Sequence, residues 1–547
     1  MFKISAESIS ARPLFALFCP LWVCLLLTGC TALPTDVHRP VSVALENSLD
    51  TRLGMAVTAR ALAAKTLNDS AFTLVSSAAL AFDSRMALVE AAEKTLDLQY
   101  YAVHADNTTD QLFAALQRAA GRGVRVRILL DDYNTAGKDS QVLRLAFEPN
   151  IEMRLFNPLP SHRASQLWRI ISSLSNAARL QRRMHNKIFV ADNAIAITGG
   201  RNLGDTYFGQ SDGVNFVDID VLVAGRMARD LSRSFDQYWN NPLAYPVQSL
   251  MTAKEVLALK PKLAASRQGQ EGFAPASVDT PAGPANTVGN AVIHGRYTPV
   301  NLQLMTWTWA ASTLLVDKPS KIADDADATE ASNDTAVDGL LSLMQRAKSD
   351  LLVVSPYFVP GPEMMNQFAD IRRRGVRIRV LTNSLASNDA VAAHAGYARY
   401  REKLLAMGVE VYEMRCEQRG TVAGLRSSLG SAGSSGGTSR ASLHAKAVVV
   451  DNRLLVVGSM NLDLRSKLQN SEVAVVIRSG KLASEATALI EPALTAGAYR
   501  VELADGRLVW RAPAGSGLPD AISEPDASFA LKILVKLIAP FAPDEML

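Results

Sequence analysis

Histidine and lysine stand two residues apart at two places in this chain, a combination that suits phosphodiester exchange. The first pair is His185 and Lys187, and the second is His444 and Lys446. Lysine ammonium groups can offset the charge on phosphoryl oxygens, while one imidazole attacks phosphorus and the other protonates the leaving alkoxide. Nothing in this chemistry requires a metal ion or another cofactor. The pairs therefore predict a single site that acts through both histidines.

Each pair begins a longer stretch, and the two stretches match without a gap. Residues 184–202 read MHNKIFVADNAIAITGGRN, and residues 443–461 read LHAKAVVVDNRLLVVGSMN. Aligned on the histidines, the copies share an aspartate, a glycine and an asparagine: Asp192 and Asp451, Gly199 and Gly458, and Asn202 and Asn461. One copy alone would leave a buried, non-catalytic histidine as an equal alternative. Because the chain has only seven histidines, two copies in register favour a shared function.

Both copies have the pattern of a β-hairpin. A hydrophobic strand runs into an Asp-Asn turn, and a second apolar strand follows. Side chains two apart on a strand share a face, so the histidine and the lysine of each copy point the same way. Asp192 and Asp451 have the opposite parity, and we expect them to brace the turn rather than contact substrate. Asn202 and Asn461 can donate hydrogen bonds to an anion, and the glycines before them permit close backbone approach.

The hairpins follow a succession of helices and strands that also occurs twice. In residues 71–134 the pattern predicts a helix, a strand, a second helix ending at Gly121 and a buried strand. The same order returns over residues 340–383, where the second helix ends at Gly375. Alternating helices and strands favour parallel or mixed sheets with helices on both faces. We expect an internal duplication in which two α/β lobes each bring one hairpin to a shared cleft.

These stretches resemble the phospholipase D superfamily, whose signature is His-x-Lys-x4-Asp, and within it the bacterial cardiolipin synthases of the C type. The resemblance rests on RRMHNKIFVADNAIAITGGRNLGDTYF (182–208), LTNSLASNDAVAAHAGYARYR (381–401) and GSMNLDLRS (458–466). It implies two duplicated phospholipase D-like α/β/α lobes with one active site at their interface. It also implies a phosphohistidine intermediate, transfer of a phosphatidyl group between alcohols, and a catalytic set that includes Asp192 and Asp451 with the two His-Lys pairs.

Two carboxylates outside the hairpins also follow from the resemblance. Asp218 and Glu472 close the two halves at corresponding places, and the superfamily uses such a carboxylate to orient a catalytic histidine. We expect Asp218 to serve His185 and Glu472 to serve His444, with a solvent-facing strand residue as the alternative. We also expect the hydroxyl of Ser459 to bind a phosphoryl or leaving-group oxygen. The family pattern further favours His185 as the nucleophile and His444 as the acid.

The N-terminus has the features of an exported lipoprotein. A short basic region precedes an apolar run from Leu14 to Leu27, which is too short for a comfortable membrane span. The run leads into Leu-Thr-Gly-Cys, which resembles a bacterial lipobox and implies a signal peptide over residues 1–29 and lipidation of Cys30. A retained signal anchor is the alternative, and both place the protein in the bacterial cell envelope, held at a membrane. Of four cysteines, only Cys416 is then a free thiol, which excludes an intramolecular disulfide framework.

The rest of the chain divides by composition. We expect a tether over 30–70, lobe 1 over 71–263, a linker and loop region over 264–337, lobe 2 over 338–500 and a C-terminal extension over 501–547. Residues 161–184 and 529–541 combine basic and apolar side chains, and each is either an interfacial helix or an ordinary one. Residues 426–440 are a Gly- and Ser-rich loop, either a lid or passive. The aromatic residues of 235–239 belong to a core.

Phosphatidyl transfer at a membrane, with a cardiolipin product, is the function that these features favour. The expected partners are a membrane surface and its phospholipids, phosphatidylglycerol first and phosphatidylethanolamine second. A formal net charge of +4 is too small to indicate a nucleic-acid partner. The alternatives are a phospholipase D-type hydrolase of lipid or nucleic acid, in which water resolves the intermediate, and a non-catalytic envelope lipoprotein. Intact His, Lys and Asn in both copies argue against the last alternative.

Overall fold

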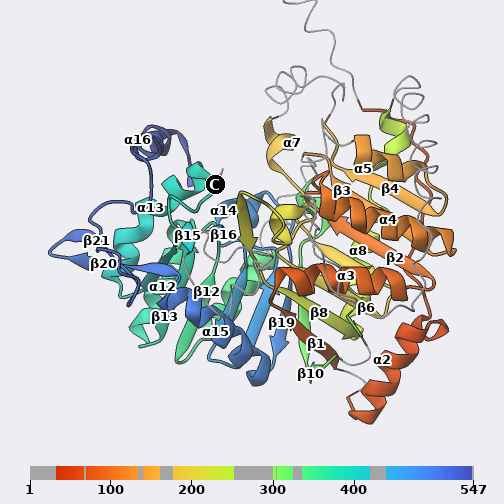
Figure 1. Ribbon diagram of the computed structural model, residues 1–547, viewed down its shortest axis with the longest axis horizontal. Coiled ribbons are helices and arrows are strands. Elements are labelled where there is room, and N and C mark those ends of the chain that lie inside the picture. The colour runs from red at the N-terminus through yellow and green to blue at the C-terminus, as the bar shows by residue number, and fades with distance from the viewer. Residues whose placement is uncertain are drawn as a thin grey trace, which may run out of the picture.

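Two lobes stand side by side in this protein, each built around a nine-stranded mixed sheet (Figure 1). The computed structural model describes residues 33–66, 69–133, 140–159, 177–251, 300–302, 305–323, 335–418 and 439–544. The expected leader with Cys30, most of the expected basic segment, and most of the expected linker and Gly-Ser-rich loop lie outside these residues.

The first sheet has the strand order β10-β1-β8-β6-β5-β2-β3-β4-β9. Its strands are β1 (Ser70–Val75), β2 (Thr95–Tyr100), β3 (Arg125–Asp131), β4 (Ile151–Phe156), β5 (Ile188–Ala191), β6 (Ile195–Gly199), β8 (Asp220–Gly225), β9 (Ala244–Pro246) and β10 (Thr308–Ala310). Strands β2, β3 and β4 are parallel to one another, and the antiparallel β5–β6 hairpin lies beside β2.

The second sheet repeats this arrangement in the order β11-β19-β18-β17-β12-β13-β14-β20-β21. Its strands are β11 (Ser312–Val316), β12 (Asp350–Val354), β13 (Arg377–Asn383), β14 (Glu410–Met414), β17 (Ala447–Val450), β18 (Leu454–Gly458), β19 (Val473–Arg478), β20 (Ala498–Ala504) and β21 (Arg507–Arg511). Here too three parallel strands, β12, β13 and β14, adjoin an antiparallel hairpin, β17–β18. The predicted duplication and the α/β class are confirmed.

Helices cover both faces of each sheet. On one face, α3 (Ala78–Ala91) and α4 (Asn107–Gly121) pack on the first sheet, and α11 (Ala336–Gln345) and α12 (Gly361–Arg373) pack on the second. On the opposite faces, α8 (Arg226–Trp239) lies on the first sheet and contacts β11, while α15 (Gly480–Thr495) lies on the second and contacts β1. The aromatic residues of α8 are fully buried, as the sequence predicted.

The remaining helices surround this framework. They are α2 (Arg52–Ala63), α5 (Ser140–Arg144), α7 (Ala177–Gln181), α13 (Val391–Ala406), α14 (Leu464–Leu468) and α16 (Phe529–Ile538), with 3-10 turns at Ser48–Asp50, Leu145–Phe147, Asp205–Tyr207, Val247–Leu250, Pro319–Lys321 and Ala539–Phe541. Local sequence explains several boundaries. The side chain of Asp106 caps the start of α4, and Thr335 and Asp338 form a capping box at the start of α11. Gly123 and Gly375 follow the corresponding helices at positive φ, where glycine is favoured.

Two features join the lobes into one body. Buried apolar side chains from both sheets form a common cluster that includes Phe72 and Val221 of lobe 1 and Leu352 and Val449 of lobe 2. A third, three-stranded sheet also crosses the interface, with β15 (Glu417–Gln418), β16 (Ser439–Leu443) and β7 (Val214–Val217) in that order. Strand β7 of lobe 1 is parallel to β16 of lobe 2. This crossing sheet leads directly to the second histidine.

The expected domain boundaries are wrong in three places. Within the expected linker, residues 308–310 form an edge strand of the first sheet and residues 312–316 an edge strand of the second. The expected tether contains helix α2, and its earlier part hydrogen-bonds α8, with the amide of Ala44 donating to Asp236 at 2.8 Å. The expected C-terminal extension supplies β21 to the second sheet. Backbone pairing at sheet edges, which composition does not reveal, accounts for the first and last of these differences.

Within the described ranges, no helix combines the length and the apolar character needed to cross a bilayer.

Candidate active site

Each hairpin turn is held by its aspartate. Asp192 and Asp451 adopt positive φ values of 51° and 53° at the turns of β5–β6 and β17–β18, a conformation that short polar side chains tolerate. Each carboxylate accepts hydrogen bonds from three consecutive backbone amides, those of Glu93, Lys94 and Thr95 for Asp192, and those of Lys348, Ser349 and Asp350 for Asp451. These amides precede or begin the neighbouring strand. The prediction that both aspartates brace the hairpins is confirmed.

The two histidines lie at the opposite end of the hairpins, where each contacts the other lobe. Nδ1 of His185 is 3.0 Å from both carboxylate oxygens of Glu472, and Nδ1 of His444 is 2.7 Å from Oδ2 of Asp218. The expected pairing of each carboxylate with the histidine of its own half is therefore wrong. All four residues are buried. The motifs form one composite site, because neither histidine has its carboxylate without the other lobe.

Backbone pairing between the lobes explains this exchange. The register of β7 and β16 ends at Val217 opposite Leu443, so the next residues, Asp218 and His444, come together. The amide of His444 donates to the carbonyl of Val217 at 2.8 Å. In the other half, the amide of His185 donates to the carbonyl of Ser471 at 2.9 Å, next to Glu472. The two halves of the site are therefore related by the same approximate symmetry as the lobes.

The Glu472 carboxylate accepts hydrogen bonds from side-chain hydroxyl groups, and its counterpart Asp218 has a glycine, Gly200, where Glu472 has Ser459. The hydroxyls of Ser459 and Ser466 both donate to the Glu472 carboxylate. The Ser459 hydroxyl also accepts from the amide of Val473 at 3.0 Å. The structure thus places Ser459 on the orienting carboxylate rather than on a substrate oxygen, contrary to expectation. In the first copy the equivalent residue is Gly200, where a Cβ atom would lie 2.3 Å from a carboxylate oxygen of Asp218.

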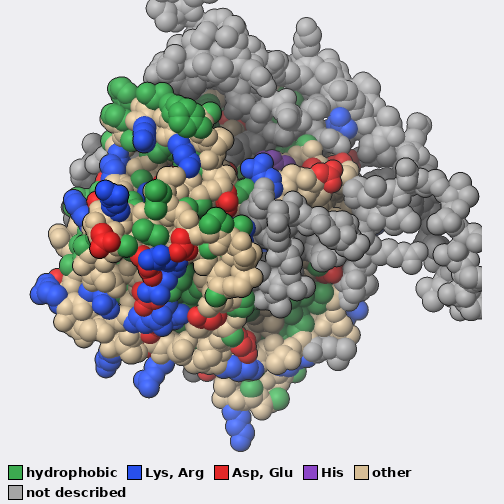
Figure 2. Space-filling view, turned by 60° about the vertical axis from the view of Figure 1, so that its left-hand side comes forward, with side chains coloured by type: hydrophobic (Ala, Val, Ile, Leu, Met, Phe, Trp, Pro, Cys, Tyr) green, Lys and Arg blue, Asp and Glu red, His purple; other side chains and the backbone are tan. Residues whose placement is uncertain are grey.

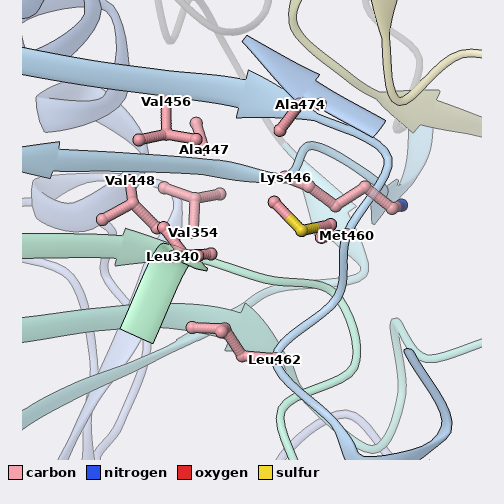
Figure 3. A pocket seen from close by; sticks show the side chains of 10 residues that line it. Leu340, Val354, Lys446, Ala447, Val448, Val456, Met460, Leu462 and Ala474 are labelled. Atoms are coloured by element: carbon pink, nitrogen blue, oxygen red, sulfur yellow. The ribbon is translucent and has the colours of Figure 1, made fainter. Parts of the chain in front are cut away.

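The two lysines are buried and their ammonium groups reach the same region. Nζ of Lys187 donates to the carbonyl of His185 at 2.7 Å, and Nζ of Lys446 donates to that of His444 at 2.5 Å. Figure 3 shows the stem of Lys446 leaving an apolar pocket that includes Val354 and Met460, with its nitrogen pointing away from that pocket. Burial lowers the pKa of Lys187 to about 7 and that of Lys446 to about 8. Both become stronger partners for an anion than water-exposed lysines.

Burial also sets the protonation of the histidines and of their carboxylates. Burial, reinforced by the nearby lysines, lowers the pKa of His185 and of His444 well below the ordinary value. It raises the pKa of Asp218 to about 6 and that of Glu472 to about 7. A neutral imidazole that donates Nδ1–H to a carboxylate presents the lone pair of Nε2 to a substrate. The free site thus favours imidazoles that are ready to act as nucleophile or base.

One charge difference separates the two histidines. The Asp389 carboxylate raises the pKa of His444, opposing the effect of burial, whereas the Arg465 guanidinium lowers the pKa of His185 further. Asp389 is exposed and accepts a hydrogen bond from the hydroxyl of Tyr357 at 2.8 Å. A hydrogen bond with the backbone of Ser459 raises the pKa of His185 in turn, and the pKa of each imidazole stays well below the ordinary value.

The two asparagines lie in the site, although their bonding differs. Asn202 accepts from the amide of Ala102 at 3.2 Å and donates to the hydroxyl of Tyr207 at 3.0 Å. Oδ1 of Asn461 is buried and has no hydrogen-bond partner among the residues that the structure describes.

Among those residues, no group of three or more His, Cys, Asp or Glu side chains is arranged to hold a metal ion.

Aromatic side chains that the sequence did not single out line the histidines. The Tyr101 ring is 4.9 Å from that of His185, measured between centroids. The rings of Tyr207 and Phe216 are 5.3 Å and 5.0 Å from that of His444. Tyr101 follows β2, the neighbour of β5 in the first sheet, whereas the pairing of the lobes brings Tyr207 and Phe216 to His444. Tyr101 and Tyr207 meet the imidazoles edge-on and Phe216 is tilted at 48°, and all three place apolar surface against the imidazoles.

Comparisons with known proteins agree with this geometry. Residues 86–239 and 340–492 match the family model described as cardiolipin synthase, PLD-like domain. Cardiolipin synthase C of Escherichia coli (strain K12) is 38% identical over 415 residues, covering 74% of this chain and 80% of that protein. An uncharacterized protein of Helicobacter pylori (strain ATCC 700392 / 26695) is 30% identical over 479 residues, covering 85% and 88%. The phosphatidylserine synthase of Haemophilus influenzae Rd KW20 shares the fold, with a TM-score of 0.53, 12% identity and coverage of 89% of this chain and 98% of that one.

Proposed function

Because this chain belongs to the family of phospholipase D-like cardiolipin synthases, we propose that it transfers a phosphatidyl group from one membrane phospholipid to a hydroxyl group of another and so makes cardiolipin. The observation that carries the proposal is the exchange of carboxylates between the lobes, which assembles two His-Lys pairs into one buried site. A phosphodiester in that site would meet two imidazoles and two ammonium groups.

The residues support a two-step exchange. Nε2 of His185 attacks phosphorus while Glu472 holds its Nδ1–H, and the bond from phosphorus to the donor's headgroup oxygen breaks. His444 gives a proton to that leaving alkoxide. The acceptor's hydroxyl then returns its proton to His444 and attacks phosphorus, and the phosphorus–nitrogen bond to His185 breaks. Lys187 and Lys446 offset the negative charge on the phosphoryl oxygens in both steps.

The charges around the site support these separate roles. Asp389 favours the proton that His444 must carry as an acid, and Arg465 disfavours a proton on His185, which must be neutral to attack. A bound phosphodiester adds negative charge beside both imidazoles and favours protonation of the one better placed to hold a proton. The nucleophile is therefore His185 in this proposal, and we assign Asn202 and Asn461 to hydrogen bonds with the phosphoryl group.

The substrates and the location complete the proposal. The acceptor is phosphatidylglycerol, whose headgroup carries the free hydroxyl that cardiolipin formation needs, and the donor is phosphatidylglycerol or phosphatidylethanolamine. The protein is exported and anchored in the cell envelope by lipid on Cys30. The Leu-Thr-Gly-Cys sequence supports this anchor. Hydrolysis by water would use the same residues but would release phosphatidic acid.

Incubation with labelled phospholipids tests the reaction. The full-length protein in vesicles is given labelled phosphatidylglycerol, phosphatidylethanolamine, or both, and the products are separated. We expect labelled cardiolipin, and we expect His185→Ala to abolish it while the control His38→Ala, at an exposed histidine outside the site, does not. Phosphatidic acid as the main product in every mixture would instead identify a hydrolase.

A further inference from the structure

The helix α16 carries a continuous apolar face that nothing in the described structure covers. Phe529, Ile533, Leu537 and Phe541 follow one another at intervals of four residues, and Leu534 lies beside them. Phe541 belongs to the 3-10 turn that follows the helix, and each of these five residues, here called the outer face of α16, is between 42% and 84% exposed. Residues four apart share one side of a helix. An exposed ridge of large apolar side chains indicates an interaction surface.

The opposite side of α16 is fixed to the second lobe. Ile538 packs against the buried pair Val359 and Ala542, and so does Tyr400 of α13. The Arg399 side chain of α13 donates to the carbonyl of Ala542 at 2.8 Å, and Arg399 and Tyr400 both contact Asp544. Because these contacts attach the opposite side of the helix to the second lobe, the outer face of α16 is directed away from the protein body.

The charges of this segment identify its partner. Between residues 529 and 541 the only charged residues are Lys532 and Lys536. An apolar ridge flanked by lysines matches a bilayer that contains anionic phospholipids, which offers an apolar interior beneath a negative surface. A second copy of this chain fits less well. It would bring two more lysines against these two without any acidic residue from the same segment.

The position of α16 relates it to the active site. The helix lies against α13 at the upper edge of the second lobe (Figure 1). In Figure 2, hydrophobic side chains gather at the upper left of the described surface, at the height of α16 in Figure 1, with Lys and Arg side chains beside them. Helix α13 begins two residues after Asp389, the carboxylate that acts on His444. From Val391 to Arg399 the helix rises about 12 Å, so the attachment of α16 lies about 12 Å along α13 from the end that is next to Asp389.

From these observations we infer that the outer face of α16 inserts into the surface of an anionic phospholipid bilayer and holds the inter-lobe site against it. The inference of insertion is based on the exposed outer face of α16 and on Lys532 and Lys536 beside it. The role of α16 in presenting lipid to the histidines rests on the proposed function. The ligand class is the bilayer of anionic phospholipid itself, independent of the N-terminal anchor.

Fluorescence at two positions tests the insertion in the full-length chain. Leu537→Cys, on the outer face, and the control Leu62→Cys, an exposed leucine of α2 in the other lobe, are each labelled with an environment-sensitive dye. The labelled parent chain gives the background from its own cysteines. With phosphatidylglycerol vesicles that contain acyl-chain spin-labelled lipid, we expect quenching at position 537 of at least twice that at position 62, and less quenching with phosphatidylcholine vesicles. Equal quenching at both positions on vesicle-bound protein would overturn the insertion. So would a dye at 537 that responds to protein concentration alone, since that would assign the face to a second copy.

A pair of substitutions tests the link to activity. Leu534→Gln with Leu537→Gln weakens the apolar ridge, and Leu62→Gln is the matched control. We expect the pair to lose about tenfold or more of the rate on phosphatidylglycerol vesicles, with an unchanged rate on short-chain phospholipids dispersed as monomers. An unchanged rate on vesicles would refute the role of α16 in lipid presentation. If the parent chain formed no cardiolipin, the proposed function would fail, whereas the quenching result would still decide the insertion.

Discussion

Replacing Glu472 by glutamine removes one charge from the composite site while keeping its shape. Both carboxylate oxygens lie 3.0 Å from Nδ1 of His185. When phosphorus bonds to Nε2, His185 becomes positively charged, and the carboxylate stabilises that charge. At this separation and an effective dielectric constant of about 20, the Coulomb attraction is about 5 kcal/mol.

The glutamine carbonyl would still accept a hydrogen bond from Nδ1–H, which recovers about 1 kcal/mol. The remaining loss of about 4 kcal/mol corresponds to about a thousandfold decrease in kcat. KM should change little, because the charge develops only as the covalent bond forms. We expect the corresponding substitution in the other half of the site, Asp218→Asn, also to decrease kcat, because Asp218 is the carboxylate partner of His444.

The fold should survive this substitution. Burial raises the pKa of Glu472 from 4.5 to about 7, so the charged carboxylate costs the folded state about 3 kcal/mol once the pH exceeds that value. This cost is absent at low pH and grows as the pH rises from the unfolded to the folded pKa. At alkaline pH the substitution by glutamine removes this cost. The gain offsets the weaker hydrogen bonds that Ser459 and Ser466 would donate to a neutral side chain. We therefore expect an unfolding free energy in urea no lower than that of the parent.

The assay is the initial rate of cardiolipin formation over a range of phosphatidylglycerol concentrations in vesicles. Glu485→Gln, which neutralises an exposed glutamate of α15, is the matched control and should retain the parent rate. Glu472→Gln retaining more than about a tenth of the parent kcat would refute the reasoning, because a neutral hydrogen bond would then suffice.

Three further predictions follow from the site and the N-terminus. His185→Ala and His444→Ala should each abolish transfer, and the double variant should be little worse, because residues that act as a unit are non-additive; substantial activity in either single variant would argue against a shared site. The value of kcat/KM should fall as the pH rises through about 7 to 8, where Lys187 and Lys446 lose the charge that binds phosphate, and a profile that stays flat up to about pH 10 would contradict this assignment. Cys30→Ser should block lipid attachment, and mass spectrometry that finds no acyl chain on the parent N-terminus would end the anchor hypothesis.

Much of the fold was predictable because its signals are local. The turn aspartates, the glycines after the helices and the apolar runs of each hairpin all act within a few residues, and two copies repeated them. The edge strands β10 and β11 were missed because each is only 3 to 5 residues long and is defined by its neighbour in the sheet. Short segments of this kind carry little periodicity of their own.

The site was predictable in its members but not in its connections. Each histidine lies beside its lysine as expected, although all four residues precede the hairpin strands instead of lying in them, and the turn aspartates lie at the far end of the hairpins as expected. Strand parity could not indicate that β7 pairs with β16 across the lobes, which gives Asp218 to His444. For the same reason the sequence did not reveal that Tyr207 stands beside His444. The contacts of Ser459 with Glu472 and of Tyr101 with His185 depend on which strands are neighbours within one sheet, which strand parity does not indicate either.

The central claim is that one site, shared by both lobes, forms a covalent bond to a histidine of the first. Rapid quenching of the full-length enzyme with a donor labelled in its phosphatidyl group, followed by peptide mapping, tests it most directly. The account predicts an acid-labile phosphorus–nitrogen linkage on the peptide that contains His185, and no such linkage in the His185→Ala variant. A label on the peptide that contains His444 would reverse the roles of the two histidines, and cardiolipin formation without any labelled histidine would contradict the mechanism altogether.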